Sequence, residues 1–232
     1  MSIADRLTEV RARISAAARS AGRDPSSVRL IAVSKTIPID AIREAWHAGQ
    51  RDFGENRVQE GLQKNATSAD LEIRWHLIGH LQTNKARKAA AAFASIQSVD
   101  SVELLQKLDQ AAVDAGTRPE LLIQVDLAGE TTKFGAAPGD LPRLLEAASR
   151  LAAAQVVGLM TLPPAPDTPE DGRPWFRRLR GLRDEWLAAG VPGSMLRELS
   201  MGMSGDFEVA IQEGATMVRV GTSIFGSRHG QR

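Results

Sequence analysis

The stretch Leu30-Ile31-Ala32-Val33-Ser34-Lys35 is a short apolar run that ends in polar residues and precedes a helix-length segment. Such a run is typical of a buried parallel strand, and the segment after it is typical of the helix in a βα unit. The arrangement recurs along the chain and predicts an α/β fold. The predicted strands are Leu30–Ser34, Arg51–Gly54, Ile73–Ile78, Ser95–Val99, Leu121–Asp126, Gln155–Leu159, Leu196–Ser200 and Met217–Val220.

An additional helix is expected before the first strand, because Ile3, Leu7, Val10 and Ile14 recur at helical spacing and Gly22 follows them. Helix-length segments separate all the predicted strands, and a short segment closes the chain. This count favours a single (βα)8 TIM-type barrel domain over residues 1–232, with an extra N-terminal helix. An open doubly wound sheet is the alternative.

Two helix starts are predicted from capping-box patterns. Asn56 is followed three residues later by Gln59, and Asp100 is followed three residues later by Glu103. A side chain that caps a helix accepts a hydrogen bond from the backbone of the first turn, and the later residue bonds back. We therefore expect helices to begin after Asn56 and after Asp100.

Composition excludes several classes of protein. The chain has 29 Lys and Arg against 28 Asp and Glu, and the two signs are interspersed, so nucleic-acid or anionic-membrane binding is not expected. The absence of Cys excludes disulfides, thiolate nucleophiles and cysteine-ligated metal sites. No apolar run approaches the ~20 residues of a membrane helix, and Met1–Gly22 lacks the apolar core of a signal peptide. A cytoplasmic protein is expected.

Lys35 is the strongest candidate for a chemically reactive side chain. Side chains alternate along a strand, so Ile31, Val33 and Lys35 share one face. If that face is the barrel interior, the lysine enters the barrel mouth above an apolar floor. Desolvation disfavours an ammonium ion and makes the amine a better nucleophile toward carbonyls, the condition for a Schiff base. The alternative is a strand-end lysine that extends into solvent.

The loops after the seventh and eighth strands resemble a phosphate cup. In (βα)8 barrels these loops often bind phosphate through backbone N–H groups, and glycine allows close approach. Small residues and hydroxyls occupy both loops here: Ser200, Gly202, Ser204 and Gly205 in one, and Gly221 and Thr222 in the other. A Schiff-base lysine beside a phosphate cup indicates a phosphorylated aldehyde, and pyridoxal 5′-phosphate (PLP) is the obvious candidate.

Several segments together resemble the YggS/PROSC family of PLP homeostasis proteins. They are Ile31–Thr36, Phe53–Asn56, Trp75–Lys85, Leu199–Ser204 and Met217–Gly226, and they occur in order across nearly the whole chain. The resemblance implies a barrel like the N-terminal domain of alanine racemase. It also implies a role in intracellular PLP (vitamin B6) homeostasis.

The resemblance implies a set of cofactor-binding residues. Lys35 would form the internal aldimine, Arg219 would face the pyridine nitrogen, and Ser200 or Ser204 would hold the phosphate with Gly221 and Thr222. Arg219 alternates with Met217 and Gly221 on one face of the last strand, which supports its assignment. The predicted cofactor-binding residues are Lys35, Asn56, Ser200, Ser204, Arg219, Gly221 and Thr222, and no residue is assigned to catalysis or to a metal.

A PLP carrier without robust catalysis is favoured over an enzyme. An arginine only donates hydrogen bonds, so it leaves the ring nitrogen unprotonated and weakens the ring as an electron sink. Alanine racemase uses a catalytic tyrosine from an added C-terminal domain, and this chain has no Tyr. The alternative is a PLP-dependent amino-acid racemase or related enzyme with His76 or His80 as second base. A phosphosugar enzyme with a Schiff-base lysine is a more distant alternative.

Partners and secondary sites are less determined by the sequence. PLP-dependent apoenzymes are the expected recipients of the cofactor, and a monomer and a weak dimer are both open. Glu130 and Lys133 are either candidates for controlling PLP release or a solvated surface pair. Some family members carry a second lysine two positions after the Schiff-base lysine, where this chain has Ile37. His76 and His80 have a metal-ligand spacing without further ligands, so no metal site is expected.

Overall fold

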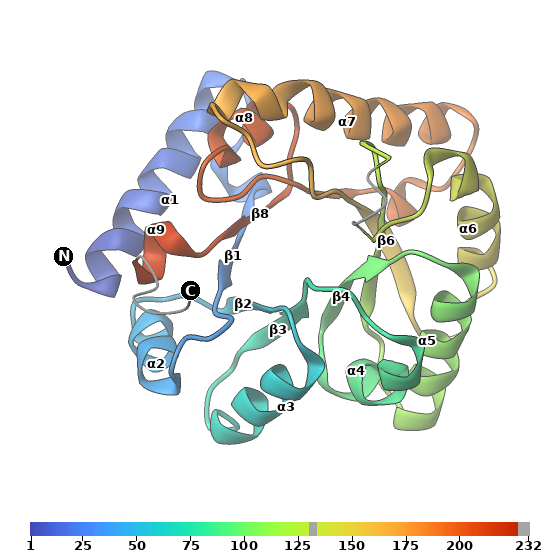
Figure 1. The fold of residues 1–232 in the computed structure, drawn as a ribbon, viewed down its shortest axis with the longest axis horizontal. Coiled ribbons are helices and arrows are strands. Elements are labelled where there is room, and N and C mark those ends of the chain that lie inside the picture. The colour runs from blue at the N-terminus through green and yellow to red at the C-terminus, as the bar shows by residue number, and fades with distance from the viewer. Residues whose placement is uncertain (130–133, 227–232) are drawn as a thin grey trace.

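Eight parallel strands close into a barrel in the computed structural model, which describes residues 1–129 and 134–226. The strands follow one another around the barrel in chain order, and the last pairs with the first (Figure 1). They are β1 (Arg29–Val33), β2 (Asp52–Glu55), β3 (Arg74–Leu77), β4 (Ser95–Val99), β5 (Glu120–Gln124), β6 (Gln155–Met160), β7 (Glu198–Ser200) and β8 (Met217–Val220). The predicted barrel is confirmed, and the open-sheet alternative is wrong.

Helices surround the barrel on its outer side (Figure 1). They are α1 (Ile3–Ser20), α2 (Ile39–His47), α3 (Val58–Thr67), α4 (Ala86–Ala92), α5 (Val102–Ala115), α6 (Leu141–Ala148), α7 (Arg173–Ala188), α8 (Phe207–Gln212) and α9 (Thr222–Phe225). The predicted N-terminal helix is therefore confirmed. It covers the region where β8 meets β1 and packs against α2, α8 and α9, because its apolar stripe faces inward.

Both predicted capping boxes are wrong. Helix α3 begins at Val58 after Arg57, and no side chain caps it, so Asn56 lies outside the helix. Helix α5 begins one residue later than expected, because the Ser101 hydroxyl accepts the hydrogen bond from the Leu104 backbone at 3.3 Å. The Asn56 side chain therefore does not cap a helix.

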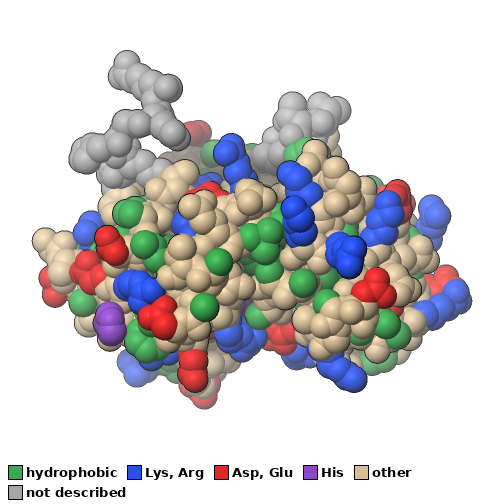
Figure 2. Space-filling view, turned by 90° about the horizontal axis from the view of Figure 1, so that it is seen from below, with side chains coloured by type: hydrophobic (Ala, Val, Ile, Leu, Met, Phe, Trp, Pro, Cys, Tyr) green, Lys and Arg blue, Asp and Glu red, His purple; other side chains and the backbone are tan. Residues whose placement is uncertain are grey.

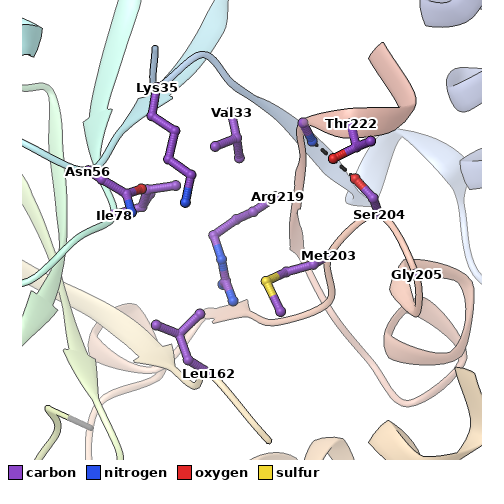
Figure 3. A pocket seen from close by; sticks show the side chains of 11 residues that line it. Val33, Lys35, Asn56, Ile78, Leu162, Met203, Ser204, Gly205, Arg219 and Thr222 are labelled. Atoms are coloured by element: carbon purple, nitrogen blue, oxygen red, sulfur yellow. Dashed lines mark hydrogen bonds between the residues drawn. The ribbon is translucent and has the colours of Figure 1, made fainter. Parts of the chain in front are cut away.

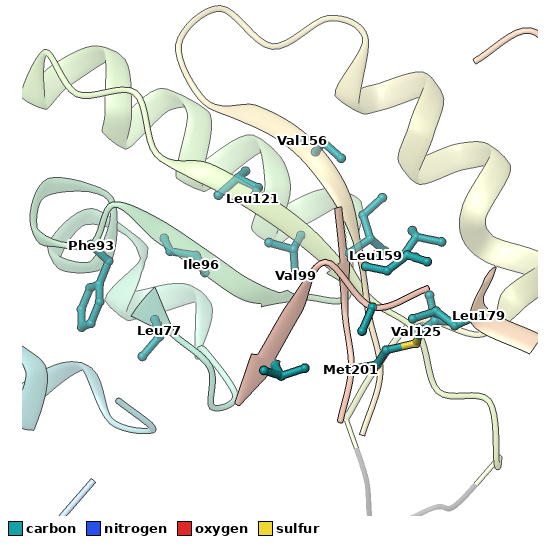
Figure 4. Packing of buried hydrophobic residues seen from close by; sticks show 14 of the residues in the cluster. Leu77, Phe93, Ile96, Val99, Leu121, Val125, Val156, Leu159, Leu179 and Met201 are labelled. Carbon is teal, nitrogen blue, oxygen red and sulfur yellow. The ribbon is translucent and has the colours of Figure 1, made fainter. Parts of the chain in front are cut away.

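The hydrophobic core has two layers. The larger layer lies between the strands and the helices, and Figure 4 shows part of it, including Phe93, Leu121 and Leu179. The smaller layer fills the barrel interior and consists of Ile31, Leu122, Val157, Met160 and Met217. The interior is thus packed with side chains below the barrel mouth, as is usual for this fold.

The outer surface carries charges of both signs. Acidic and basic side chains are interspersed over the face seen in Figure 2, and helix α7 illustrates how they pair. Arg173 and Arg177 on this helix contact the nearly buried Glu213 at 2.7 and 3.1 Å. Within the described residues, the helices are too short or too polar to cross a membrane.

Replacing Leu7 with Ala should destabilise the protein by about 2–5 kcal/mol, because Leu7 is fully buried under α1 and its loss leaves a cavity. Urea unfolding measures this change. Val113→Ala on α5 is the matched control, since Val113 is 49% exposed, and it should change stability by less than about 1 kcal/mol. Equal effects of the two substitutions would contradict the packing of α1 on the barrel.

Candidate functional site

A cavity of about 460 Å³ lies at the C-terminal ends of the strands (Figure 3). This volume is in the range of small-molecule sites. Six of the seven residues predicted from the sequence line it, and Ser200 does not. The lining residues are Val33, Lys35, Asn56, Ile78, Leu162, Met203, Ser204, Gly205, Arg219, Gly221 and Thr222.

Lys35 lies in the turn two residues after the end of β1 and lines the cavity. Ile31 belongs to the interior layer, while Val33 and Lys35 follow on the same face and line the cavity above it. The side chain of Lys35 extends into the cavity, toward the space that the Arg219 guanidinium also faces (Figure 3). The interior position that the sequence predicts for Lys35 is confirmed.

The backbone next to Lys35 is strained and held from outside the barrel. Thr36 has a φ of +64°, a left-handed conformation that β-branched residues rarely adopt. Its backbone N–H donates to Glu60 Oε1 on α3 at 2.6 Å. Lys64, also on α3, donates to the carbonyl oxygen of Ser34 at 2.6 Å. Helix α3 therefore fixes the residues on both sides of Lys35.

Buried charges on α3 and β2 support this turn. Lys64 Nζ lies 2.8 Å from Glu55 Oε1 and 2.7 Å from Glu60 Oε1. The Ser34 hydroxyl also donates to Glu55, at 2.6 Å. Burial raises the pKa of Glu55 despite these bonds. Removing one partner of a buried pair leaves a costly lone charge, so the three side chains constrain one another and the Ser34–Thr36 backbone.

Arg219 is a buried cation with an orientation fixed by two hydrogen bonds. Its Nη1 donates to the Ser200 hydroxyl at 2.6 Å, and its Nη2 donates to the carbonyl oxygen of Thr161 at 2.9 Å. Burial lowers the pKa of Arg219 to about 10, although the charge of Asp206 opposes the shift. The guanidinium therefore stays charged at neutral pH and presents its charge to the cavity (Figure 3).

Ser200 lies below the cavity. It is fully buried, and its hydroxyl donates to Gln97 Oε1 at 2.6 Å while accepting from Arg219. Its hydroxyl is thus used in holding Arg219. The register of β7 explains this position, because Ser200 pairs with Met217, two residues before Arg219 on β8.

The loops after β7 and β8 meet at the opposite end of the cavity from Lys35 (Figure 3). The Gly221 backbone N–H donates to the Ser204 hydroxyl at 3.2 Å, and Thr222 follows directly. A methyl group on Gly221 would lie 3.2 Å from the carbonyl oxygen of Val33, so a side chain here would press against β1. Two hydroxyls and a glycine backbone therefore lie together, a set of groups suited to an oxyanion.

Asn56 occupies the mouth beside Lys35 and Ile78 (Figure 3). The chain after β3 passes close to it, since a methyl group on Gly79 would lie only 2.3 Å from the Asn56 carbonyl oxygen. Glycine at position 79 thus lets the two loops approach each other. The side chain of Asn56 is available to the cavity because it does not cap α3.

The two histidines of interest have separate environments. His76 is fully buried in the barrel, with Nε2 2.8 Å from Asp52 Oδ1 and Nδ1 3.3 Å from Gln97 Nε2. His80 lies at the rim, where its ring stacks on Phe134 with centroids 3.5 Å apart. Neither lines the cavity. Glu130 and Lys133 lie outside the described residues.

Sequence analysis missed several residues around the cavity. Leu162 and Met203 supply apolar lining, and the Thr161 carbonyl anchors Arg219. Gln97 was also missed, although a glutamine inside the apolar strand Ser95–Val99 is a signal that could have been followed. As a whole, the described cavity offers one amine, one guanidinium and an oxyanion cradle.

Comparisons with known proteins agree with this arrangement. Residues 6–229 match the family model described as alanine racemase, N-terminal domain. The chain is 44% identical to a pyridoxal phosphate homeostasis protein of Aquifex aeolicus, over 98% of this chain and 99% of the relative. It is 47% identical to a protein of the same name from Pseudomonas aeruginosa, over 97% of this chain and 96% of the relative.

A solved structure is similarly close. The structure of PipY from Synechococcus elongatus with PLP bound superposes with a TM-score of 0.86 at 45% identity. The superposition covers 97% of this chain and all of PipY. The similarity therefore extends over nearly the whole of this chain.

Proposed function

Because the chain belongs to the family of pyridoxal phosphate homeostasis proteins, we propose that it binds PLP in the cavity described above and serves intracellular PLP homeostasis. The observation that carries this proposal is the shared cavity of Lys35, Arg219 and the Ser204–Gly221–Thr222 cradle. In this family's structure from Synechococcus elongatus PLP is bound. The proposed site of action is the cytoplasm, with the whole chain as one domain.

The residues present fit PLP. The cofactor combines an aldehyde, a pyridine nitrogen and a phosphate, and the cavity offers a different type of partner for each. The amine lies at one end and the cradle lies at the other, while the guanidinium faces the space between (Figure 3). A side chain at position 221 would press against Val33, so glycine lets this loop lie close to β1. The buried charge of Arg219 also favours an anionic ligand.

We assign the cofactor-binding roles as follows. Lys35 would supply the amine for a Schiff base with the aldehyde of PLP, with loss of water. Arg219 donates to the pyridine nitrogen, and Asn56 contacts the cofactor beside Lys35. Ser204, Gly221 and Thr222 hold the phosphate. Ser200 acts indirectly by holding Arg219, since its hydroxyl is already engaged beneath the cavity.

A carrier is proposed in preference to an enzyme, because the described lining lacks a second proton-transfer group. Apart from Lys35 and Arg219, the residues that line the cavity among those described are apolar, hydroxyl, amide or glycine residues. Racemisation needs a base on each side of the substrate carbon, and Arg219 is a poor base at neutral pH. The recipients of PLP would be PLP-dependent apoenzymes, with the carrier acting as a monomer or weak dimer.

Adding PLP to the purified protein should produce a yellow absorption band that Lys35→Ala abolishes, because the amine forms the Schiff base. Visible spectra with and without PLP measure this. Lys88→Ala is the matched control, since Lys88 is exposed on α4 away from the cavity, and it should retain the band. A wild type without the band, or a Lys35→Ala variant that keeps it, would overturn the assignment.

The same loaded protein tests the absence of robust catalysis. Incubation with a panel of amino acids, followed by chiral chromatography, should detect no sustained racemisation, transamination or decarboxylation. Turnover at about 1 per second or faster, which is ordinary for enzymes, would replace the carrier by the racemase alternative.

Ser204→Ala should weaken PLP binding by about tenfold, because a hydroxyl that bonds a charged phosphate contributes about 1.5 kcal/mol. Dissociation constants of PLP and of pyridoxal, which lacks the phosphate, separate this effect from a general loss of structure. The affinity for pyridoxal should be unchanged. Equal losses for both ligands would show that Ser204 does not act on the phosphate.

A further inference from the structure

A chain of hydrogen bonds crosses the barrel interior from its N-terminal end to the cavity. It links one residue from each of five strands, in the order Asp52, His76, Gln97, Ser200 and Arg219. The four successive distances are 2.8, 3.3, 2.6 and 2.6 Å. His76, Gln97 and Ser200 are fully buried. Their neighbours in the interior layer are apolar, including Ile31, Leu122 and Met217.

The direction of every bond in this chain is set from its two ends. Arg219 can only donate, so Ser200 accepts from it and its single hydroxyl proton goes to Gln97 Oε1. At the other end the Asp52 carboxylate can only accept, so His76 Nε2 carries a proton. In a neutral imidazole Nδ1 is then an acceptor, and it receives the Gln97 Nε2–H. Both ends demand the same orientation of the Gln97 amide.

Charged groups around His76 keep it in this state. Asp52 on the neighbouring strand β2 accepts a hydrogen bond from it, and the charges of Arg74, on the same strand β3, and of Arg29 on β1 also act on it. Glu120 on β5 contacts both arginines, at 3.7 and 3.3 Å, while Glu198 on β7 lies 4.0 Å from Arg29. Burial lowers the pKa of His76, and the two arginine charges add to this effect while Asp52 opposes it.

Packing of the barrel interior alone would not require this series of hydrogen bonds. Three buried polar side chains in an apolar layer cost desolvation that hydrophobic residues of similar size would avoid. What the chain adds is a single orientation for the Ser200 hydroxyl and hence a fixed acceptor for Arg219. Without that acceptor, one of the two bonds that hold the guanidinium toward the cavity is lost.

We propose that Gln97 is a positioning residue that couples the neutral Nε2–H tautomer of His76 to the orientation of Arg219, and thereby to the affinity of the cavity for PLP. This inference rests on the proposed function. If His76 gains a second proton, Nδ1–H faces the Gln97 NH2 group, two donors oppose each other, and the amide must turn. Ser200 then loses its acceptor, and Arg219 loses its fixed partner.

The first test uses Gln97→Met, which keeps the side-chain volume and removes the amide's hydrogen bonds to His76, Ser200 and the Met217 sulfur. Its affinity for PLP should fall about tenfold at neutral pH, as expected for the loss of one oriented bond to a charged group. Ser95→Ala is the matched control. Ser95 is buried on the same strand, its hydroxyl has no hydrogen-bond partner among the described residues, and its substitution should leave the affinity unchanged.

The pH dependence of PLP affinity tells whether Gln97 positions Arg219 or only fills space in the barrel interior. As the pH falls below 6.5, the ordinary pKa of histidine, wild type and Ser95→Ala should lose affinity more steeply than Gln97→Met, and because burial lowers the pKa of His76 the divergence should begin on the acid side of that value. Titration of PLP itself is common to all three proteins and cancels in the comparison. Parallel pH profiles for the three proteins would overturn the coupling, as would an unchanged affinity in Gln97→Met.

A second measurement needs no cofactor and does not depend on the folding of a variant. Nitrogen-15 NMR of the apo-protein labelled at histidine should show one buried imidazole as the neutral Nε2–H tautomer at pH about 7. A charged ring or the Nδ1–H tautomer at His76 would overturn the inference. If wild type fails to bind PLP, the proposed function falls and this inference falls with it. If wild type binds but Gln97→Met binds equally well, only this inference falls.

Discussion

The pairing of β8 with β1 is the contact on which the site depends. Lys35 lies near the start of the chain and Arg219 near its end, yet the register of these strands places Ile31 beside Arg219. Closing the barrel therefore brings the amine and the guanidinium to one cavity. In an open sheet with these strands at opposite edges, the two side chains would be separated by the width of the sheet. Helix α1 supports this contact from outside, where its apolar stripe covers the closure (Figure 1).

Two groups of polar side chains then fix the two cations that face the cavity, the Lys35 amine and the Arg219 guanidinium, at positions where apolar residues would cost less desolvation. Outside the barrel, Lys64 and Glu60 hold the strained turn that follows Lys35. Inside it, Ser200 and Gln97 hold Arg219. Buried charges and amides stabilise a fold little, since desolvation offsets most of their attraction, but they tolerate few geometries. Their placement on either side of one cavity indicates that stability is exchanged there for a defined arrangement.

Strand alternation was sufficient to predict the inner positions of Lys35, Arg219 and Gly221, because a side-chain period of two needs no knowledge of neighbouring strands. Alternation did not predict that Ser200 lies below the cavity, because its position along the barrel axis depends on how β7 aligns with β8. Register between strands is a tertiary property. Asn56 shows the other limit, since its capping pattern is local whereas α3 begins two residues later, at the buried Val58, without a side-chain cap. The interior chain through Gln97 needs contacts among five strands and is invisible to any local pattern.

We propose Lys35 as the covalent attachment point for PLP, in a cavity formed by barrel closure. Borohydride reduction of the loaded protein followed by peptide mass spectrometry tests it most directly. The added pyridoxyl phosphate mass should occur on the peptide that contains Lys35. Labelling confined to other lysines, such as Lys64 or Lys107, or no labelling of a protein that retains PLP, would contradict it.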